Sequence, residues 1–367
     1  MSSMWRAGWA ITVAGLLLVG GCGRAAASPV RLPLGVDVGW VVNGPPASVA
    51  LTAAKASEIK ATGAGLARVE FRTSPFFGQV NPAFYQDYDQ VVQNLAQAGI
   101  QVLGLIDYAT VSGAQSAWTQ NGASNAVSSG ANAYTAQFAQ TAAAIMAHYK
   151  GKIRYWEIWN EPNAWTQNDG GGVYSGGTFM YPNNYAALLQ QTYDQAVGVD
   201  HLPVTIISAG LLGGAFGGAY TAQNSGATYL AQVFQSWHAQ GLQSFPLDAV
   251  GQHLYIAQGG NAGDVVSAAQ VAEYLNWVHQ VPLEFGSKGL PTFLTEVGWN
   301  SSQVGATDKQ QNLETAIGVA EKTAYVHALV WYNLQSSGTA RYGLYQAGGT
   351  PSPSLAAYRK LAAAWGP

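Results

Sequence analysis

The chain of 367 residues is poor in charged side chains. Aspartate, glutamate, lysine and arginine make up 10% of it, against about 25% in an average soluble domain. The formal net charge is −3, and no run of lysine or arginine is present. These features exclude the basic surface that nucleic-acid binding requires, so we expect no nucleic-acid partner. Apolar residues make up 48%, which is ample for a large core.

Cysteine occurs once, at Cys22, which excludes an intramolecular disulfide. It follows Arg6 and the uncharged, mostly apolar stretch Ala7–Gly21. That stretch is shorter than the about 20 residues of a membrane span and is typical of an export signal. The segment Leu18–Cys22 resembles a bacterial lipobox, whose cysteine becomes the lipidated first residue of the mature protein.

We therefore predict that residues 1–22 are a lipoprotein-type signal peptide and that residues 23–33 are a short tether. The mature protein would be exported and held at the cell surface by a lipid on Cys22, which would be its only contact with a membrane. The alternative is a simple cleaved signal with an incidental cysteine, which would leave a secreted, soluble protein.

Several catalytic motifs are also absent. No Gly-x-Gly-x-x-Gly follows the first predicted strand, which removes the usual dinucleotide-binding fingerprint. Neither Gly-x-Ser-x-Gly nor His-Glu-x-x-His is present, so a serine or metal hydrolase of these types finds no support. We expect no metal ion and no organic cofactor.

Short apolar runs alternate with helical patterns from residue 34 onward. The predicted strands cover 34–40, 66–72, 101–107, 153–160, 204–210, 248–254, 291–297 and 328–334. The helix-like segments cover 47–63, 82–98, 132–150, 183–198, 227–240, 267–280, 308–323 and 353–364. Eight such units predict an α/β fold, a single (β/α)8 TIM barrel over residues 34–367. An open doubly wound sheet is the competing architecture, but it does not usually reach eight regular units.

Two glutamates each lie where an apolar run ends. Glu161 follows the strand 153–160, and Glu296 lies at the end of the strand 291–297. In a barrel these are strands four and seven, whose ends lie roughly opposite across the mouth. Carboxyl groups about 5–5.5 Å apart perform retaining glycoside hydrolysis, whereas inversion needs about 6.5–9.5 Å. Strand positions four and seven favour the shorter separation.

The segments around both glutamates resemble those of clan A glycoside hydrolases, the "4/7" barrels. Trp156–Asn163 reads WEIWNEPN and Leu294–Trp299 reads LTEVGW, and both are similar to segments of families 39 and 5. The resemblance extends over nearly all of the chain beyond the signal, from Gly35 to about Leu361. It implies that Glu161 protonates the leaving glycosidic oxygen and later deprotonates water, while Glu296 attacks the anomeric carbon.

The resemblance also implies roles for polar residues on other strands. Asn160 would hydrogen-bond the 2-hydroxyl of the sugar. Arg68 matches the clan's strand-two arginine, which holds the nucleophile ionised, and Arg72 is the alternative for this role. His253 and Tyr255 resemble the clan's His-x-Tyr segment, in which the tyrosine hydroxyl donates to the nucleophile.

Aromatic and acidic residues near strand ends are further candidates for substrate binding. Trp331 in the eighth strand resembles the platform under the bound sugar ring. Trp165 and Trp299 stand beside the two glutamates, and we expect both to contact carbohydrate. Asp37 lies at the end of the first strand, where barrel sites draw their residues.

Other acidic and aromatic residues are ambiguous. Asp107 and Trp40 also lie at strand ends, where they could line the cleft or serve only the fold. We interpret Glu70 and Glu157 as buried, paired barrel carboxylates rather than as catalysts.

The sequence thus predicts a monomeric retaining hydrolase of β-glycosidic bonds in an extracellular polysaccharide or oligosaccharide. The alternative is a catalytically inactive carbohydrate-binding barrel at the cell surface. Resemblance to family 39 suggests β-xylosides or exopolysaccharide, and resemblance to family 5 suggests β-glucan or β-mannan. The segment around Glu296 is also similar to β-1,3-glucanases, although those lack the Trp-Asn-Glu-Pro form at strand four. Sugar, linkage and endo or exo action stay open.

Overall fold

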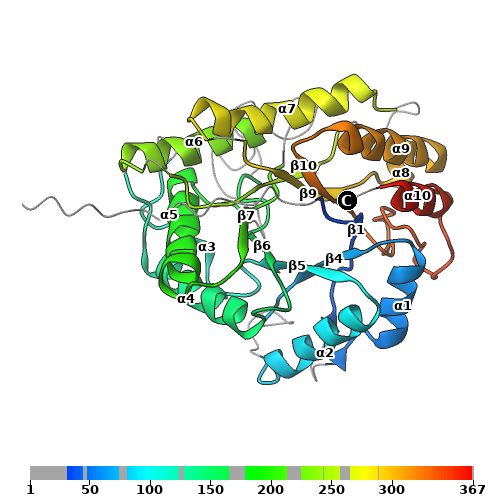
Figure 1. Ribbon diagram of the computed structural model, residues 1–367, viewed down its shortest axis with the longest axis horizontal. Coiled ribbons are helices and arrows are strands. Elements are labelled where there is room, and N and C mark those ends of the chain that lie inside the picture. The colour runs from blue at the N-terminus through cyan, green and yellow to red at the C-terminus, as the bar shows by residue number, and fades with distance from the viewer. Residues whose placement is uncertain are drawn as a thin grey trace, which may run out of the picture.

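Eight parallel strands form a barrel at the centre of the protein (Figure 1). The computed structural model describes residues 31–43, 48–73, 81–123, 128–164, 178–212, 225–242, 244–256, 265–287 and 289–365. In chain order the barrel strands are β1 (Gly35–Asp37), β4 (Leu66–Glu70), β5 (Gln101–Ile106), β6 (Tyr155–Ile158), β7 (Thr205–Ser208), β8 (Val250–Leu254), β9 (Thr292–Val297) and β10 (Val326–Trp331). The prediction of a single (β/α)8 barrel is confirmed.

Hydrogen bonding connects the strands into a ring. The order β7-β6-β5-β4-β1-β10-β9-β8 follows from parallel ladders between neighbours. Backbone hydrogen bonds between β7 and β8 close the ring, because the Ser208 amide donates to Ala249 (3.0 Å) and the Asp248 amide donates to Ile206 (2.8 Å). A closed ring leaves no free sheet edge and brings all carboxyl ends of the strands to one face.

Helices surround the barrel (Figure 1). They are α1 (Ala53–Ala61), α2 (Phe84–Gln97), α3 (Gln115–Trp118), α4 (Ala133–His148), α5 (Pro182–Tyr193), α6 (Gly226–Ala239), α7 (Ala268–Glu284), α8 (Ser301–Val304), α9 (Ala306–Lys322) and α10 (Pro353–Ala364). A π-helical turn, η2 (Asp194–Val199), continues α5. Across the described ranges, no helix is both long enough and apolar enough to span a bilayer.

Local sequence accounts for several helix ends. The Asn132 side chain accepts from the Thr135 amide while the Thr135 hydroxyl accepts from the Asn132 amide, which is a reciprocal cap at the start of α4. Ser267 and Gln270 make the same cap at the start of α7. The predicted helix 47–63 begins only at Ala53, because the preceding residues pair as β2 (Val42–Asn43) and β3 (Ser48–Val49).

The core has two layers. The larger one lies between the strands and the helices. The smaller one fills the lower barrel and consists of Leu32, Leu66, Leu103, Tyr155, Ile207, Ala249, Phe293, Ala328 and Val330. Alternate residues of a strand point to the same face, so Arg68 follows Leu66 into the barrel and Glu157 follows Tyr155. The apolar floor thereby carries a charged layer at the carboxyl end of the strands.

Candidate active site

The end of β6 carries an unusual backbone turn. Trp159 has φ of 74° and Glu161 has φ of 48°, so both adopt the left-handed conformation. Such a conformation costs a non-glycine residue about 1–3 kcal/mol and persists only where the surroundings enforce it. Thr178 does so, because its carbonyl accepts from the Trp159 indole (2.7 Å) and its hydroxyl donates to the Glu161 carbonyl (2.7 Å). The turn sends the Trp159 ring into the outer core and Asn160 into the barrel.

Arg68 lies at the centre of the charged layer and is 4% exposed. Its guanidinium donates to Glu157 (2.6 Å), Glu296 (2.6 Å) and Asp37 (3.0 Å). It also donates to the side-chain oxygen of Asn160 (2.9 Å). One cation therefore compensates three buried carboxylates from β1, β6 and β9, and the same cation orients the asparagine next to Glu161.

Glu157 is fully buried below Arg68. The Gly210 amide (2.8 Å) and the Thr295 hydroxyl (2.9 Å) donate to its second oxygen. Its two oxygens thus accept three hydrogen bonds from Arg68, Gly210 and Thr295. Its geometry agrees with a buried, paired barrel carboxylate.

Glu161 and Glu296 lie together at the mouth. Carboxylate oxygens of the two residues and a ring nitrogen of His253 all lie within 4.8 Å of one another. His253 Nδ1 is 2.8 Å from Glu161 and 3.7 Å from Glu296. The Tyr255 hydroxyl donates to Glu296 Oε2 (2.5 Å), while Arg68 donates to Glu296 Oε1. Both oxygens of Glu296 are therefore held, whereas Glu161 has the more exposed side chain, 21% against 10%.

Burial and charge act together on His253 and Tyr255. Burial lowers the pKa of His253, but the charge of Glu296 and the hydrogen bond to Glu161 outweigh it and raise the pKa above its usual value. Burial and the charge of Glu296 raise the pKa of Tyr255 well above its usual value. The Tyr255 hydroxyl therefore stays protonated and donates a hydrogen bond to the carboxylate at all ordinary pH values.

Comparison with known proteins agrees with this geometry. The family model described as Cellulase (glycosyl hydrolase family 5) matches residues 35–197, a segment that includes Glu161 and ends before Glu296. Solved structures of glycoside hydrolase families 39 and 5 superpose on the whole barrel. The chain is thus similar to clan A glycoside hydrolases, in sequence over residues 35–197 and in fold over the barrel. No curated protein sequence matches it.

Three of the similar structures illustrate how far the likeness reaches. A family 39 glycoside hydrolase from the gut symbiont Bacteroides cellulosilyticus WH2 has 19% identity and a TM-score of 0.61, over 90% of this chain and 64% of that one. A GH5_18 protein from Bifidobacterium longum subsp. infantis has 13% identity and a TM-score of 0.64, over 92% and 79%. An endo-β-1,4-glucanase from Xanthomonas axonopodis pv. citri has 17% identity and a TM-score of 0.57, over 90% and 98%. The chain thus spans under two thirds of the first of these, and all three share its fold.

The structure corrects two predicted sugar contacts. Trp331 and Trp299 are both fully buried, and their ring centroids are 6.1 Å apart. The Trp331 indole donates to the Tyr342 carbonyl (3.2 Å) and the Trp299 indole donates to the Ile256 carbonyl (2.7 Å). Neither ring presents a face to the cleft, so both support the wall of the site from behind. Trp165 lies outside the described residues, as does Cys22 with the rest of the predicted signal.

Of the remaining strand-end candidates, Asp37 contacts the site, whereas Arg72 and Trp40 contact each other outside it. Asp37 joins the site through Arg68. Arg72 donates instead to Glu70 (2.6 Å), and its guanidinium stacks over the exposed ring of Trp40 at 4.6 Å. Arg68 rather than Arg72 is therefore the arginine next to Glu296.

Two tyrosines that the sequence analysis did not identify also belong to the site. Tyr332 and Tyr342 lie edge-on to Tyr255, at centroid distances of 6.2 and 6.0 Å, and 5.4 Å from each other. Burial and the charges of Asp37 and Glu296 raise the pKa of Tyr332, so its hydroxyl stays protonated. The only signal for Tyr332 in the sequence is its place near the end of a strand, and Tyr342 comes from the long loop that follows that strand.

Metal binding at the carboxylate pair is disfavoured by its neighbours. Within the part of the chain that the structure describes, Glu161, His253 and Glu296 form the group whose ligand atoms approach closely enough for an ion. The guanidinium of Arg68 and the hydroxyl of Tyr255 already occupy both oxygens of Glu296. These donors suit a carboxylate that faces a substrate rather than a cation.

Proposed function

We propose that the protein is a retaining hydrolase of β-glycosidic bonds, with Glu161 as acid/base and Glu296 as nucleophile. The observation that carries the proposal is the approach of carboxylate oxygens of these two residues to within 4.8 Å. Retaining enzymes hold the two carboxyl groups about 5–5.5 Å apart, whereas inverting enzymes leave about 6.5–9.5 Å for a water molecule. The approach supports the retaining mechanism.

The two glutamates have environments suited to different roles. Arg68 and Tyr255 each hold one oxygen of Glu296 with a donor, which fixes its direction of attack. Glu161 is more exposed and shares its hydrogen bond with His253, so it can both release and accept a proton at the mouth.

The reaction takes two steps. Glu161 gives its proton to the glycosidic oxygen while Glu296 attacks the anomeric carbon, and the bond to the leaving sugar breaks. Glu161 then takes a proton from water as that water attacks the same carbon and releases Glu296. The Asn160 side-chain oxygen accepts from Arg68, so its amide nitrogen is the group left to donate to a sugar hydroxyl.

Azide rescue distinguishes the two glutamates. Glu296→Ala should abolish turnover, and azide should restore it with an inverted glycosyl azide as product, because azide takes the place of the carboxylate. Glu161→Ala should slow hydrolysis about 10²–10⁴-fold, and azide should then give a product of retained configuration. Glu314→Ala, at an exposed position on α9, is the control and should keep full activity.

Activity that survives both Glu161→Ala and Glu296→Ala would rule out this mechanism. Tight binding of an oligosaccharide by the unmodified protein, with no product over long incubation, would instead support the inactive sugar-binding barrel.

The substrate we propose is a polysaccharide or oligosaccharide. One structure with the same fold is an endo-β-1,4-glucanase, so β-1,4-glucans should be tested first, followed by β-xylan, β-mannan and β-1,3-glucan. Analysis of early products decides between release from chain ends and cleavage in the interior.

We propose that the protein is a monomer, because one chain supplies every residue of the site described above. Sedimentation of the purified protein tests this oligomeric state.

We also propose that the protein acts outside the cytoplasm, attached to the membrane by a lipid on Cys22. The support is the uncharged stretch that precedes this single cysteine. Cys22→Ala should move the protein from the membrane fraction to the soluble fraction. An unchanged distribution would contradict the lipid anchor and favour a secreted, soluble protein.

A further inference from the structure

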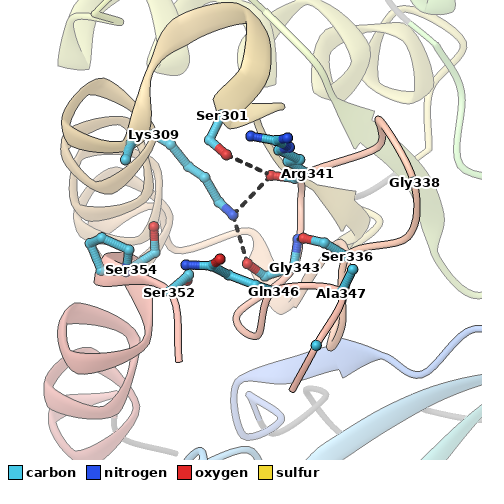
Figure 2. A pocket seen from close by; sticks show the side chains of 13 residues that line it. Ser301, Lys309, Ser336, Gly338, Arg341, Gly343, Gln346, Ala347, Ser352 and Ser354 are labelled. Carbon is cyan, nitrogen blue, oxygen red and sulfur yellow. Dashed lines mark hydrogen bonds between the residues drawn. The ribbon is translucent and has the colours of Figure 1, made fainter. Parts of the chain in front are cut away.

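A cavity lies next to the segment that carries Tyr342, between the loops that follow β9 and β10. It has a volume of about 380 Å³. Figure 2 shows Lys309 reaching into it from α9, with the 336–347 segment on one side and the start of α10 on the other. All of these segments lie at the carboxyl end of the barrel strands, the end where TIM barrels frequently bind phosphate groups.

Lys309 is a buried cation that pairs with no carboxylate among the residues that the structure describes. The residue is 2% exposed, and its ammonium donates to the carbonyls of Gly343 (2.6 Å) and Arg341 (3.2 Å). An ammonium has three hydrogens, so one donor remains after these two bonds. Burial lowers the pKa of Lys309 to about 7, and no carboxylate counteracts this effect. A buried charge without a counterion is costly, and an anion in the cavity would reduce that cost.

The start of α10 provides further unmatched donors. Ser352 is the N-cap residue, but its side chain makes no bond to the helix, and its hydroxyl is buried without a partner. Ser354 is 1% exposed, lines the same cavity, and its hydroxyl also has no partner in the described part of the chain. The first turn of a helix also presents backbone N–H groups and a partial positive charge.

We propose that this cavity binds a small oxyanion, the carboxylate, sulfate or phosphate group of a ligand. The Lys309 ammonium and the Ser354 hydroxyl would donate to it from opposite sides, and Arg341 would add a second positive charge at the rim. A cavity of this volume is at the lower end of the range for ligand pockets, about 300–1,000 Å³, which fits a small group better than a sugar chain.

An anion in this cavity would also affect the active site through Tyr342. The two carbonyls held by Lys309 belong to the residues on either side of Tyr342, and the Tyr342 ring lies 6.0 Å from that of Tyr255. An anion that keeps Lys309 charged would strengthen these two bonds and stiffen the loop that carries Tyr342. The binding proposal does not depend on the proposed catalysis, because binding is measured without turnover.

Titration with sulfate tests the site directly. Sulfate remains a dianion over the whole range of interest, so any pH dependence reports on the protein. We expect saturable stabilisation in thermal melts of the whole protein, tighter below pH 7 than above it, because Lys309 carries its charge in the lower range. Ser354→Ala should weaken the affinity about tenfold, as expected for loss of a hydrogen bond to a charged group. Lys309→Met should abolish binding.

Two control variants match these changes. Ser57→Ala lies on an exposed turn of α1, and Lys360→Met lies on the exposed face of α10. Both should bind sulfate as the unmodified protein does. Absence of saturable stabilisation, or equal affinity in Ser354→Ala and the controls, would overturn the proposal even if Lys309→Met does not fold.

A second titration identifies the source of the anion. If the ligand is the acidic group of a glycan, sulfate should compete with an oligosaccharide that carries uronic acid and not with its neutral counterpart. If the ligand is a free oxyanion, sulfate and inorganic phosphate should compete only with each other. Competition in neither titration would contradict the site.

Discussion

Replacing Glu157 with glutamine keeps the shape of a side chain below the active site and removes its charge. Glu157 is fully buried and accepts from the Arg68 guanidinium (2.6 Å), the Gly210 amide (2.8 Å) and the Thr295 hydroxyl (2.9 Å). A glutamine has one acceptor oxygen and one NH₂ group. The Thr295 hydroxyl can rotate to accept, but the NH₂ group must then face an N–H of either Arg68 or Gly210.

The cost of this change follows from the contacts. A hydrogen bond to a charged group contributes about 1.5–3 kcal/mol, and removal of one partner of a buried ion pair costs about 3–5 kcal/mol. Asp37 and Glu296 still pair with Arg68 in this variant, so the charge of Arg68 remains partly compensated. We expect the free energy of unfolding to fall by about 3–5 kcal/mol, and Tm to fall by roughly 4–7 °C in a domain of this size.

Denaturant and thermal unfolding followed by circular dichroism measure this effect and need no substrate. Glu58→Gln is the matched control, since Glu58 pairs with Lys55 on α1 (2.9 Å) with both side chains about one third exposed. An exposed pair contributes about 0–1 kcal/mol. If Glu157→Gln costs no more than Glu58→Gln, the buried network does not stabilise the barrel and the reasoning is refuted.

The remaining predictions concern Tyr255 and His253, which contact the glutamates, and Gly210, which lies against the His253 ring. Gly210→Ala would place a Cβ 2.0 Å from the His253 ring, whereas the control Gly198→Ala meets nothing within 4 Å. Gly210→Ala should therefore remove most of the activity and about 1–3 kcal/mol of stability. Equal kcat/KM and equal melting curves in the two variants would contradict this prediction. Tyr255→Phe removes one donor to Glu296. It should lower kcat/KM about 10–100-fold and Tm by roughly 2–4 °C; wild-type kcat/KM would show that the hydroxyl is dispensable. Burial lowers the pKa of His253, but the neighbouring carboxylates outweigh burial, so the pKa in the folded state is raised. The charged His253 then contributes its full stabilisation of the folded state below the unfolded pKa of about 6.5. This contribution is lost as pH rises through the folded pKa. Unfolding midpoints of the wild type and His253→Asn should therefore differ more at acid than at alkaline pH, and a constant difference would argue against a charged His253.

Much of the fold was predictable from sequence because its signals are local. A strand end followed by a loop is a short-range pattern, so the alternation of eight strands and eight helices was sufficient to predict the barrel. That order also places Glu161 after strand four and Glu296 at the end of strand seven, and the (β/α)8 topology then requires both to be at one end of the ring. Along β4, the alternation of side chains puts Arg68 on the same inward face as Leu66.

The tertiary structure decided what depends on closure of the ring. Arg68 and Arg72 have the same inward parity in sequence, and only the barrel shows that Arg68 meets Glu296 while Arg72 turns to Glu70. Trp299 and Trp331 stand beside functional residues, yet both rings are buried. The cavity around Lys309 forms where the start of α9, the 336–348 loop and the start of α10 fold together, an arrangement that sequence spacing does not show. Sequence spacing determines the direction of a side chain along its own strand or helix, whereas its neighbours come from segments that only the closed barrel brings together.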